Sequence, residues 1–223
     1  PAFGSEWYPR KMYTQGTLEY EHHLKTYGSC ARFGYKDFIP SFTMQNFAPA
    51  DWAKLFADAG AKFVVPVAEH HDGFAMYESS LNPYNAKAMG PCRDAVGELG
   101  DAVRDAGLTL GLSSHRAEHY WFFGKGLAFD SDVRDVANAG LYGVGGKLPV
   151  DLDVSEFHQF HHARPSAEVV EDWLLNTCDF VQKYRPKLVW FDWWINNFGY
   201  RKALREFAAF YYNCCHMWGI EGA

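Results

Sequence analysis

Three short apolar segments, each preceded by an amphipathic helical pattern, restrict this chain to an α/β fold with parallel strands. These segments are Phe63–Ala68, Leu108–Leu112 and Leu188–Phe191. Strands that are apolar along their whole length are typical of a parallel sheet covered by helices on both faces. A regular alternation of helix and strand produces such a sheet. The sequence therefore predicts the α/β class, although Pro66 has no N–H to donate within the first strand.

Four helices are predicted from apolar residues spaced three and four positions apart. They cover about residues 49–59, 93–106, 166–184 and 200–218. Gly60 and Gly107 follow the first two, where glycine commonly ends a helix. The residues predicted to face inward are Trp52, Leu55, Phe56 and Ala59 in the first helix and Val96, Leu99 and Val103 in the second.

An open doubly wound sheet and a (β/α)8 barrel both fit this alternation. No G-x-G-x-x-G motif follows a strand, so dinucleotide binding has no support and no cofactor is expected. Three strands in 223 residues are few beside the eight of a barrel, which typically has about 250 residues. A barrel would be about half present, as roughly four βα units in one domain. A long inserted loop is predicted over about residues 113–165, and its histidine-rich stretch His158–His162 is interpreted as solvated loop.

Charge and composition exclude several classes of function. The formal net charge is -6, and no stripe of Lys and Arg could follow a nucleic-acid backbone. No run of 18 apolar residues predicts a membrane span, and no signal-peptide pattern is present. The five cysteines form no C-x-x-C, so neither a zinc site nor a full disulfide framework is predicted. The compartment (secreted, periplasmic or lysosome-like) and the oligomeric state stay open.

Titratable side chains follow each of the three apolar segments. The first is followed by His70, His71 and Asp72, the second by Ser114, His115, Arg116, Glu118 and His119, and the third by Asp192. The carboxyl ends of parallel strands meet at one rim, where the active sites of such proteins lie. The sequence therefore predicts an active site or ligand site at this rim.

Asp192 stands among three tryptophans, Trp190, Trp193 and Trp194. A carboxylate lined by Trp and His suits glycoside hydrolysis, in which one carboxylate attacks an oxocarbenium-like centre and a second carboxyl group protonates the leaving oxygen. Asp192 is the candidate nucleophile, and a helix-capping acid is its structural alternative. The candidate second acids within the chain are Glu6, Asp72 and Glu118.

A metal-dependent hydrolase is the rival interpretation of the strand-end histidines. His70, His115 and Asp192 would supply three ligands, in the number that a catalytic zinc site requires. However, His70 and His71 are adjacent, and neighbouring side chains in extended backbone point to opposite sides. The histidines are therefore expected to hydrogen-bond hydroxyl groups, and no metal is expected. Acyl transfer has little support, because no G-x-S-x-G motif is present and no cysteine follows a strand.

Five motifs that occur in order resemble the catalytic domain of the retaining α-L-fucosidases, glycoside hydrolase family 29. They are SEWYPRKMY (residues 5–13), YKDFIPSF (35–42), HHDGFAMY (70–77), MGPCRDAVGEL (89–99) and LVWFDWW (188–194). The resemblance implies a (β/α)8-like TIM-type barrel, of which this chain holds only the N-terminal part. It also implies removal of terminal α-L-fucose from oligosaccharides or glycoconjugates with retention of configuration.

The same resemblance implies roles for individual residues. Asp192 matches the nucleophile that forms the covalent fucosyl-enzyme. Residues that match sugar-binding positions are Glu6, Trp7, His70, His71 and Trp190. These roles agree with the residue types, because a deoxy sugar needs hydroxyl partners beside an apolar face.

Three departures from the family pattern limit what the resemblance implies. An apolar strand ending in an HWG-type motif is not found, and the usual YYS is replaced by Ser113-Ser114-His115, so that His115 takes the place of a tyrosine contact. The family's acid/base glutamate follows the nucleophile and is expected beyond Ala223. A relative that binds fucose or another carbohydrate without catalysis is therefore the alternative function.

Overall fold

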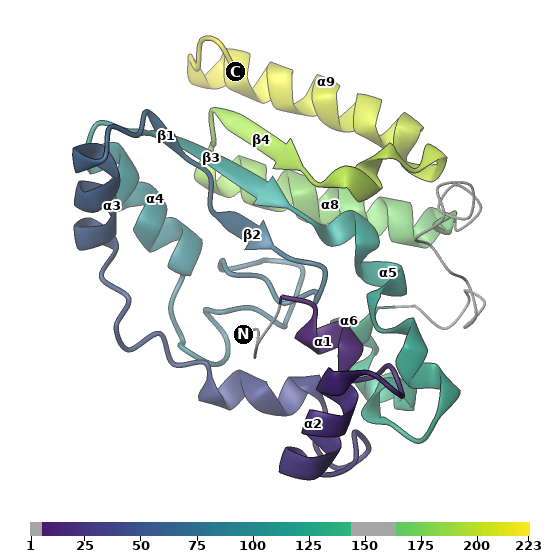
Figure 1. Ribbon diagram of the computed structural model, residues 1–223. Helices are drawn as coiled ribbons and strands as arrows, with labels where there is room; N and C mark the ends of the chain where they lie inside the picture. The colour runs from purple at the N-terminus through teal and green to yellow at the C-terminus, as the bar shows by residue number, and fades with distance from the viewer. Residues whose placement is uncertain (1–5, 144–163) are drawn as a thin grey trace.

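The computed structural model describes residues 6–143 and 164–223, so the stretch His158–His162 lies outside the described residues. Its sheet consists of the parallel strands β1 (Phe63–Val64), β2 (Val67–Glu69), β3 (Thr109–Ser114) and β4 (Leu188–Phe191). β3 is central, with β1 and β2 on one side and β4 on the other (Figure 1). The predicted α/β class with a parallel sheet is therefore confirmed.

The first predicted strand is interrupted at Pro66. β1 pairs with the beginning of β3, and β2 pairs with its end, so the two short strands follow one line along the sheet. Proline has no N–H to offer the ladder, but the Pro66 carbonyl still accepts a hydrogen bond from Ser113 N at 3.0 Å. The interruption places the carboxyl end of β2 beside that of β3.

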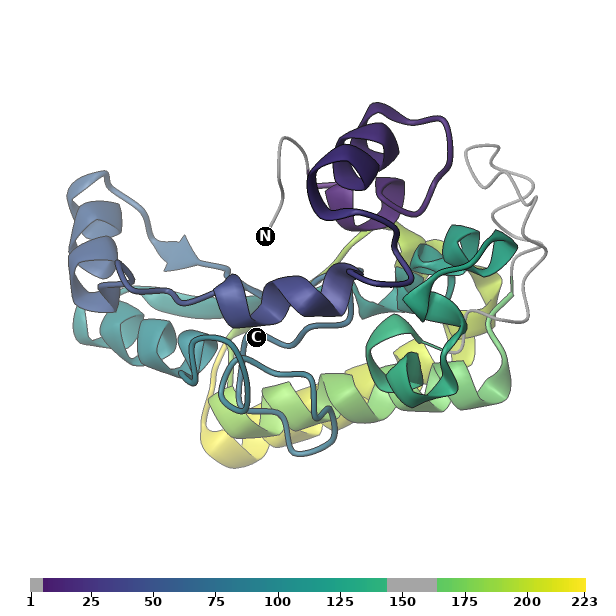
Figure 2. The same ribbon diagram turned by 90° about the horizontal axis from the view of Figure 1, so that it is seen from below.

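Four long helices occupy the predicted ranges. They are α3 (Pro49–Asp58), α4 (Ala95–Asp105), α8 (Ala167–Tyr184) and α9 (Arg201–Trp218). Asp94 caps α4 by accepting a hydrogen bond from Gly97 N at 2.9 Å, and Ser166 caps α8 in the same way. Helices α8 and α9 run side by side along the sheet (Figures 1 and 2). Of the helices in the described ranges, none has the length and apolarity that a membrane crossing requires.

The apolar faces predicted for α3 and α4 differ in how far they are buried. Val96, Leu99 and Val103 of α4 are buried, as predicted. The prediction for α3 is wrong: Trp52 and Leu55 are 44% and 64% exposed. α3 packs on α4 through the side that carries Ala53, and the two-residue strand β1 leaves little sheet surface beneath the remaining stripe.

The segment that follows β3 is built of short helices as far as residue 143. These are η2 (Arg116–Glu118), α5 (His119–Phe122), η3 (Gly124–Ala128), η4 (Asp132–Arg134), η5 (Val136–Asn138) and α6 (Ala139–Tyr142). The N-terminal elements α1 (Tyr8–Lys11), α2 (Leu18–Tyr27) and η1 (Tyr35–Ser41) pack against it. The Tyr13 hydroxyl, for example, donates to Asp132 Oδ1 at 2.8 Å. This packing brings Trp7, which precedes α1, to the carboxyl ends of the strands.

Candidate active site

The residues that follow β2, β3 and β4 converge at the carboxyl ends of the strands. His115 Nδ1 lies 3.4 Å from Asp192 Oδ2, and His71 Nε2 lies 3.6 Å from the same oxygen. The His70 ring lies 4.2 Å from that of His71 and 4.8 Å from that of His115, measured between centroids. Residues far apart in the sequence thus form one polar cluster around a carboxylate, which we call the strand-end cluster: His70, His71, His115 and Asp192.

The adjacent histidines do not point apart as the sequence predicts. The ligand atoms of His70, His71 and His115 all lie within 4.8 Å of one another, and in the described residues this is the group suited to hold a metal. Extended backbone ends at Glu69, and a turn follows in which Gly73 N donates to the His70 carbonyl at 3.2 Å. Gly73 has a φ of +74°, which few other residues adopt readily. The alternation rule for strands therefore does not apply at His71.

His71 is held as a neutral ring with its acceptor nitrogen toward Asp192. The ring is buried and stacks on Trp7, with centroids 5.7 Å apart. Its Nδ1 lies 3.1 Å from the His115 carbonyl oxygen, which only accepts, so Nδ1 carries the proton and Nε2 the lone pair. Burial, with smaller effects of His70 and His115, lowers the pKa of His71 to about 2. A sugar hydroxyl would find a ready acceptor at Nε2.

Asp192 lies directly after β4 and before η7 (Trp193–Asn196). Its side chain makes no capping hydrogen bond to this helix, which disfavours the capping alternative, and it is 31% exposed. Phe191 packs on Trp173 and Phe207 of the helical layer, at 5.3 and 5.2 Å between ring centroids. Side chains alternate along a strand, so Trp190 lies on the opposite face, and 60% of it is exposed. The exposed Trp190 side chain therefore faces away from the helices, and Asp192 follows two residues later, just after the strand.

Of the three candidate second acids, Asp72 is hydrogen-bonded within the structure and Glu6 is exposed to solvent. Asp72 accepts a hydrogen bond from the Tyr35 hydroxyl through Oδ2 and one from Phe74 N through Oδ1, so it stabilises the turn that carries His71. Glu6 is exposed, next to Trp7.

Glu118 is the third candidate acid, and the structure gives it an unusual environment. It is fully buried, and Oε2 lies 3.2 Å from His71 Nδ1, on the side of the ring away from Asp192. That nitrogen donates its one proton to the His115 carbonyl, and among the described residues neither Glu118 oxygen has a hydrogen-bond partner. Burial raises the pKa of Glu118 to about 8, with Arg10 opposing and Asp192 adding to the shift. The sequence shows only that Glu118 follows His115 closely. Its burial against His71 depends on the tertiary fold.

The raised pKa predicts that stability decreases from pH 6.5 to 8. The folded state keeps the Glu118 proton up to pH about 8, whereas an ordinary glutamate loses it near 4.5, so rising pH costs about 1.4 kcal/mol of unfolding free energy per pH unit within this interval. His71 and His119, whose pKa values burial lowers to about 2 and about 3, have the opposite effect, but only below 6.5. The free energy of unfolding is measured by urea denaturation at pH 6.5 and at pH 8. We expect Glu118→Gln to remove its decrease between these two pH values. The exposed control Glu21→Gln should retain it; an equal decrease in all three proteins would contradict the prediction.

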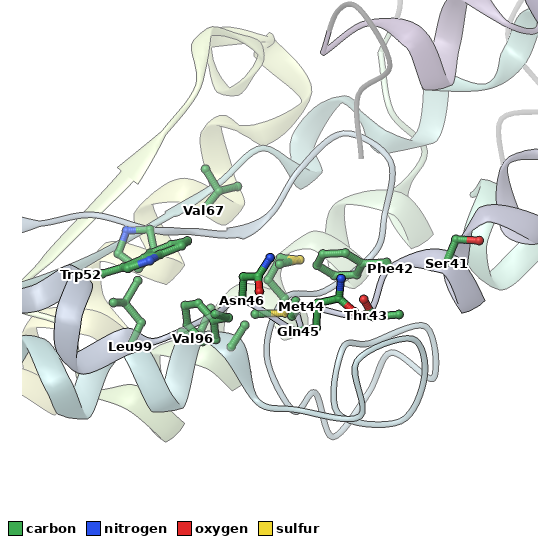
Figure 3. Close-up of a pocket in the computed structure, with 14 residues that line it drawn as sticks. Ser41, Phe42, Thr43, Met44, Gln45, Asn46, Trp52, Val67, Val96 and Leu99 are labelled. Atoms are coloured by element: carbon green, nitrogen blue, oxygen red, sulfur yellow. The ribbon is translucent and has the colours of Figure 1, made fainter.

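Two cavities share Phe42, Val67 and Met76 in their lining, and the smaller one borders the cluster at His70. The smaller, about 300 Å³, has His70 and Asp72 at its polar end and is otherwise apolar or aromatic, with Tyr35, Phe38 and Phe74 among its lining residues. The larger, about 590 Å³, is lined by residues 41–47 and by α3 and α4 (Figure 3). None of its lining residues is titratable. Reactive groups therefore border only the smaller of these two cavities.

Comparison with known proteins agrees with the motifs. The family model described as alpha-L-fucosidase matches residues 1–218. The tissue alpha-L-fucosidase of Macaca fascicularis is 40% identical over 196 residues, which cover 86% of this chain and 34% of the relative. The alpha-L-fucosidase of Dictyostelium discoideum is 30% identical, covering 95% and 41%. A Thermotoga maritima alpha-fucosidase, solved with a mechanism based inhibitor, superposes with a TM-score of 0.70 and 28% identity, covering 94% and 43%.

These matches extend over nearly the whole chain but over less than half of each of the three relatives. The family match includes both Trp7 and Asp192. The chain therefore belongs to the alpha-L-fucosidase family.

Proposed function

We propose that the protein carrying this chain is a retaining exo-α-L-fucosidase that removes terminal fucose from oligosaccharides or glycoconjugates. The observation that supports it most is the position of Asp192, with His71 and His115 at 3.6 and 3.4 Å from Oδ2. The names of the family and of its relatives support the substrate, and a Thermotoga maritima relative has been solved in complex with fucose.

In this proposal Asp192 Oδ2 attacks the anomeric carbon of fucose and the leaving oxygen departs with a proton. The resulting covalent fucosyl-enzyme is then hydrolysed, and the two inversions give net retention. His71 Nε2 accepts a hydrogen bond from a sugar hydroxyl, while His70 and His115 contact neighbouring hydroxyls. Trp7, Glu6 and Trp190 complete the sugar pocket, with Trp190 against an apolar face of the sugar.

The acid/base of this reaction is proposed to lie in another part of the protein. Retaining enzymes hold their two carboxyl groups about 5–5.5 Å apart, with both facing the substrate. Glu118 is buried behind His71, and Asp72 is bonded to Tyr35 and Phe74. Neither is free to reach a leaving oxygen.

We further propose that the chain is one partial catalytic domain of a (β/α)8-like barrel, with an insertion at about 113–165. The superposition on the Thermotoga maritima enzyme over 94% of this chain supports this arrangement. So do the outer strands, because β1 and β4 each pair with β3 alone among the described strands. Open strand edges of this kind can pair with further barrel strands.

We expect the protein to hydrolyse para-nitrophenyl α-L-fucoside and to release α-L-fucose first. ¹H NMR distinguishes the two anomers before mutarotation mixes them. Initial release of the β-anomer would overturn the retaining mechanism. Binding of L-fucose in calorimetry without any hydrolysis would instead support the carbohydrate-binding alternative.

A further inference from the structure

We infer that the strand-end cluster is also a binding site for a divalent transition-metal ion, best suited to Zn²⁺, and that the bound ion blocks Asp192. The proposed ligands are Asp192 Oδ2, His71 Nε2, His115 Nδ1 and one nitrogen of His70. Only the inhibitory consequence of metal binding rests on the proposed fucosidase function.

Two of the distances in the cluster are close to those of a tetrahedral zinc site. Zinc bonds to nitrogen and oxygen are about 2.0–2.1 Å, so neighbouring ligand atoms around zinc lie about 3.3–3.4 Å apart. The separations of Asp192 Oδ2 from His115 Nδ1 and His71 Nε2 are 3.4 and 3.6 Å. The three histidines keep their ligand atoms within 4.8 Å of one another. Small rotations of the half-buried His70 and His115 rings would bring all four atoms to one ion.

The ligand nitrogens have the right orientation and lack competing partners. His71 donates Nδ1–H to the His115 carbonyl at 3.1 Å, an outer contact of the kind that fixes metal-bound histidines with the other nitrogen forward. His115 Nδ1 is buried, and within the described ranges it has no hydrogen-bond partner. A metal ion would satisfy this nitrogen at the same time as it neutralises the carboxylate.

The ligand set also selects the class of metal. Three imidazoles and one carboxylate match the preference of Zn²⁺, Ni²⁺ and Cu²⁺ for nitrogen, whereas Mg²⁺ and Ca²⁺ prefer oxygen. A single carboxylate is too few oxygen ligands for the latter pair. Once an ion occupies Oδ2, this oxygen no longer reaches an anomeric carbon, so the ion and the sugar compete for one site.

Equilibrium dialysis of the protein against ZnCl₂ tests binding without reference to activity. We expect one Zn²⁺ per chain, with a Kd at least about tenfold weaker in His71→Asn and His115→Asn. His216→Asn, an exposed histidine on α9, is the matched control and should leave the Kd unchanged. Circular dichroism confirms that the variants fold. Saturating L-fucose should weaken zinc binding to the wild-type protein, a measurement that requires no variant.

The outcomes separate this inference from the proposed function. No zinc bound at millimolar concentration, or an unchanged Kd in both variants, would overturn the metal site even if the protein hydrolyses fucosides. If the protein binds zinc as expected but hydrolyses no fucoside, the metal site is supported and the proposed fucosidase activity is contradicted. If hydrolysis occurs, Zn²⁺ should raise KM without lowering kcat, and Mg²⁺ should do neither. Inhibition that lowers only kcat would refute the blocking of Asp192.

Discussion

Replacing Asp192 with glycine should lower kcat/KM for para-nitrophenyl α-L-fucoside by about 10³-fold or more, as the loss of a nucleophile generally does. Removal of the carboxylate leaves the pocket formed by His71, His115 and Trp190 but provides no atom to attack the anomeric carbon. Initial rates at several substrate concentrations measure the effect. Because sugar contacts remain, we expect kcat to account for most of the loss.

Azide provides the positive control for this assignment. In Asp192→Gly the space left by the side chain should admit azide, which attacks the same carbon and yields β-L-fucosyl azide with partial recovery of rate. The matched charge control is a pair of asparagine variants. Asp192→Asn should be inactive, whereas Asp101→Asn, whose parent side chain on α4 is 81% exposed, should retain wild-type activity. Near wild-type turnover by Asp192→Gly without azide would exclude Asp192 as the nucleophile.

The elements that the sequence predicts best are those with strong local signals. Helices α4, α8 and α9 are predicted correctly because their apolar residues recur at helical spacing, and in α4 and α8 the capping residues Asp94 and Ser166 fix the N-terminus as well. The exposed stripe of α3 is not recovered. Local pattern identifies an amphipathic helix, but it does not reveal how much sheet lies beneath it, and β1 is only two residues long. The sequence already shows that Pro66 lacks the N–H that a continuous strand requires. In the structure the strand is divided there into β1 and β2.

For the candidate site, the sequence predicts the rim but not the geometry within it. Strand-end position is enough to bring His115 and Asp192 together, because parallel strands share one carboxyl edge. The convergence of His70 with His71 depends on the turn closed at Gly73, and strand alternation therefore gives the wrong answer. The burial of Glu118 depends on the packing of the N-terminal segment against α5, a long-range contact that no local pattern encodes.

The second large effect is expected at Arg116, a buried guanidinium next to His115. It forms ion pairs with Glu69 at the end of β2 and with Asp172 of α8, the latter at 2.7 Å, so it connects three elements that carry the rim. Glu69 is itself 2% exposed. Arg116→Met would leave this carboxylate buried without its partner, and such changes typically cost about 3–5 kcal/mol. Urea unfolding followed by fluorescence measures the loss in free energy.

A double substitution distinguishes the cost of the unpaired Glu69 carboxylate from the loss of packing. Burial is the main cause that raises the pKa of Glu69, because its charged form is desolvated, and Arg116 opposes that shift. Glu69→Gln should therefore recover much of the stability that Arg116→Met loses, since a neutral amide needs no counter-charge. Lys54→Met is the surface control: its pair with Asp58 is 73% and 62% exposed, so the change should cost less than about 1 kcal/mol. If the double variant is no more stable than Arg116→Met alone, the arginine acts by packing.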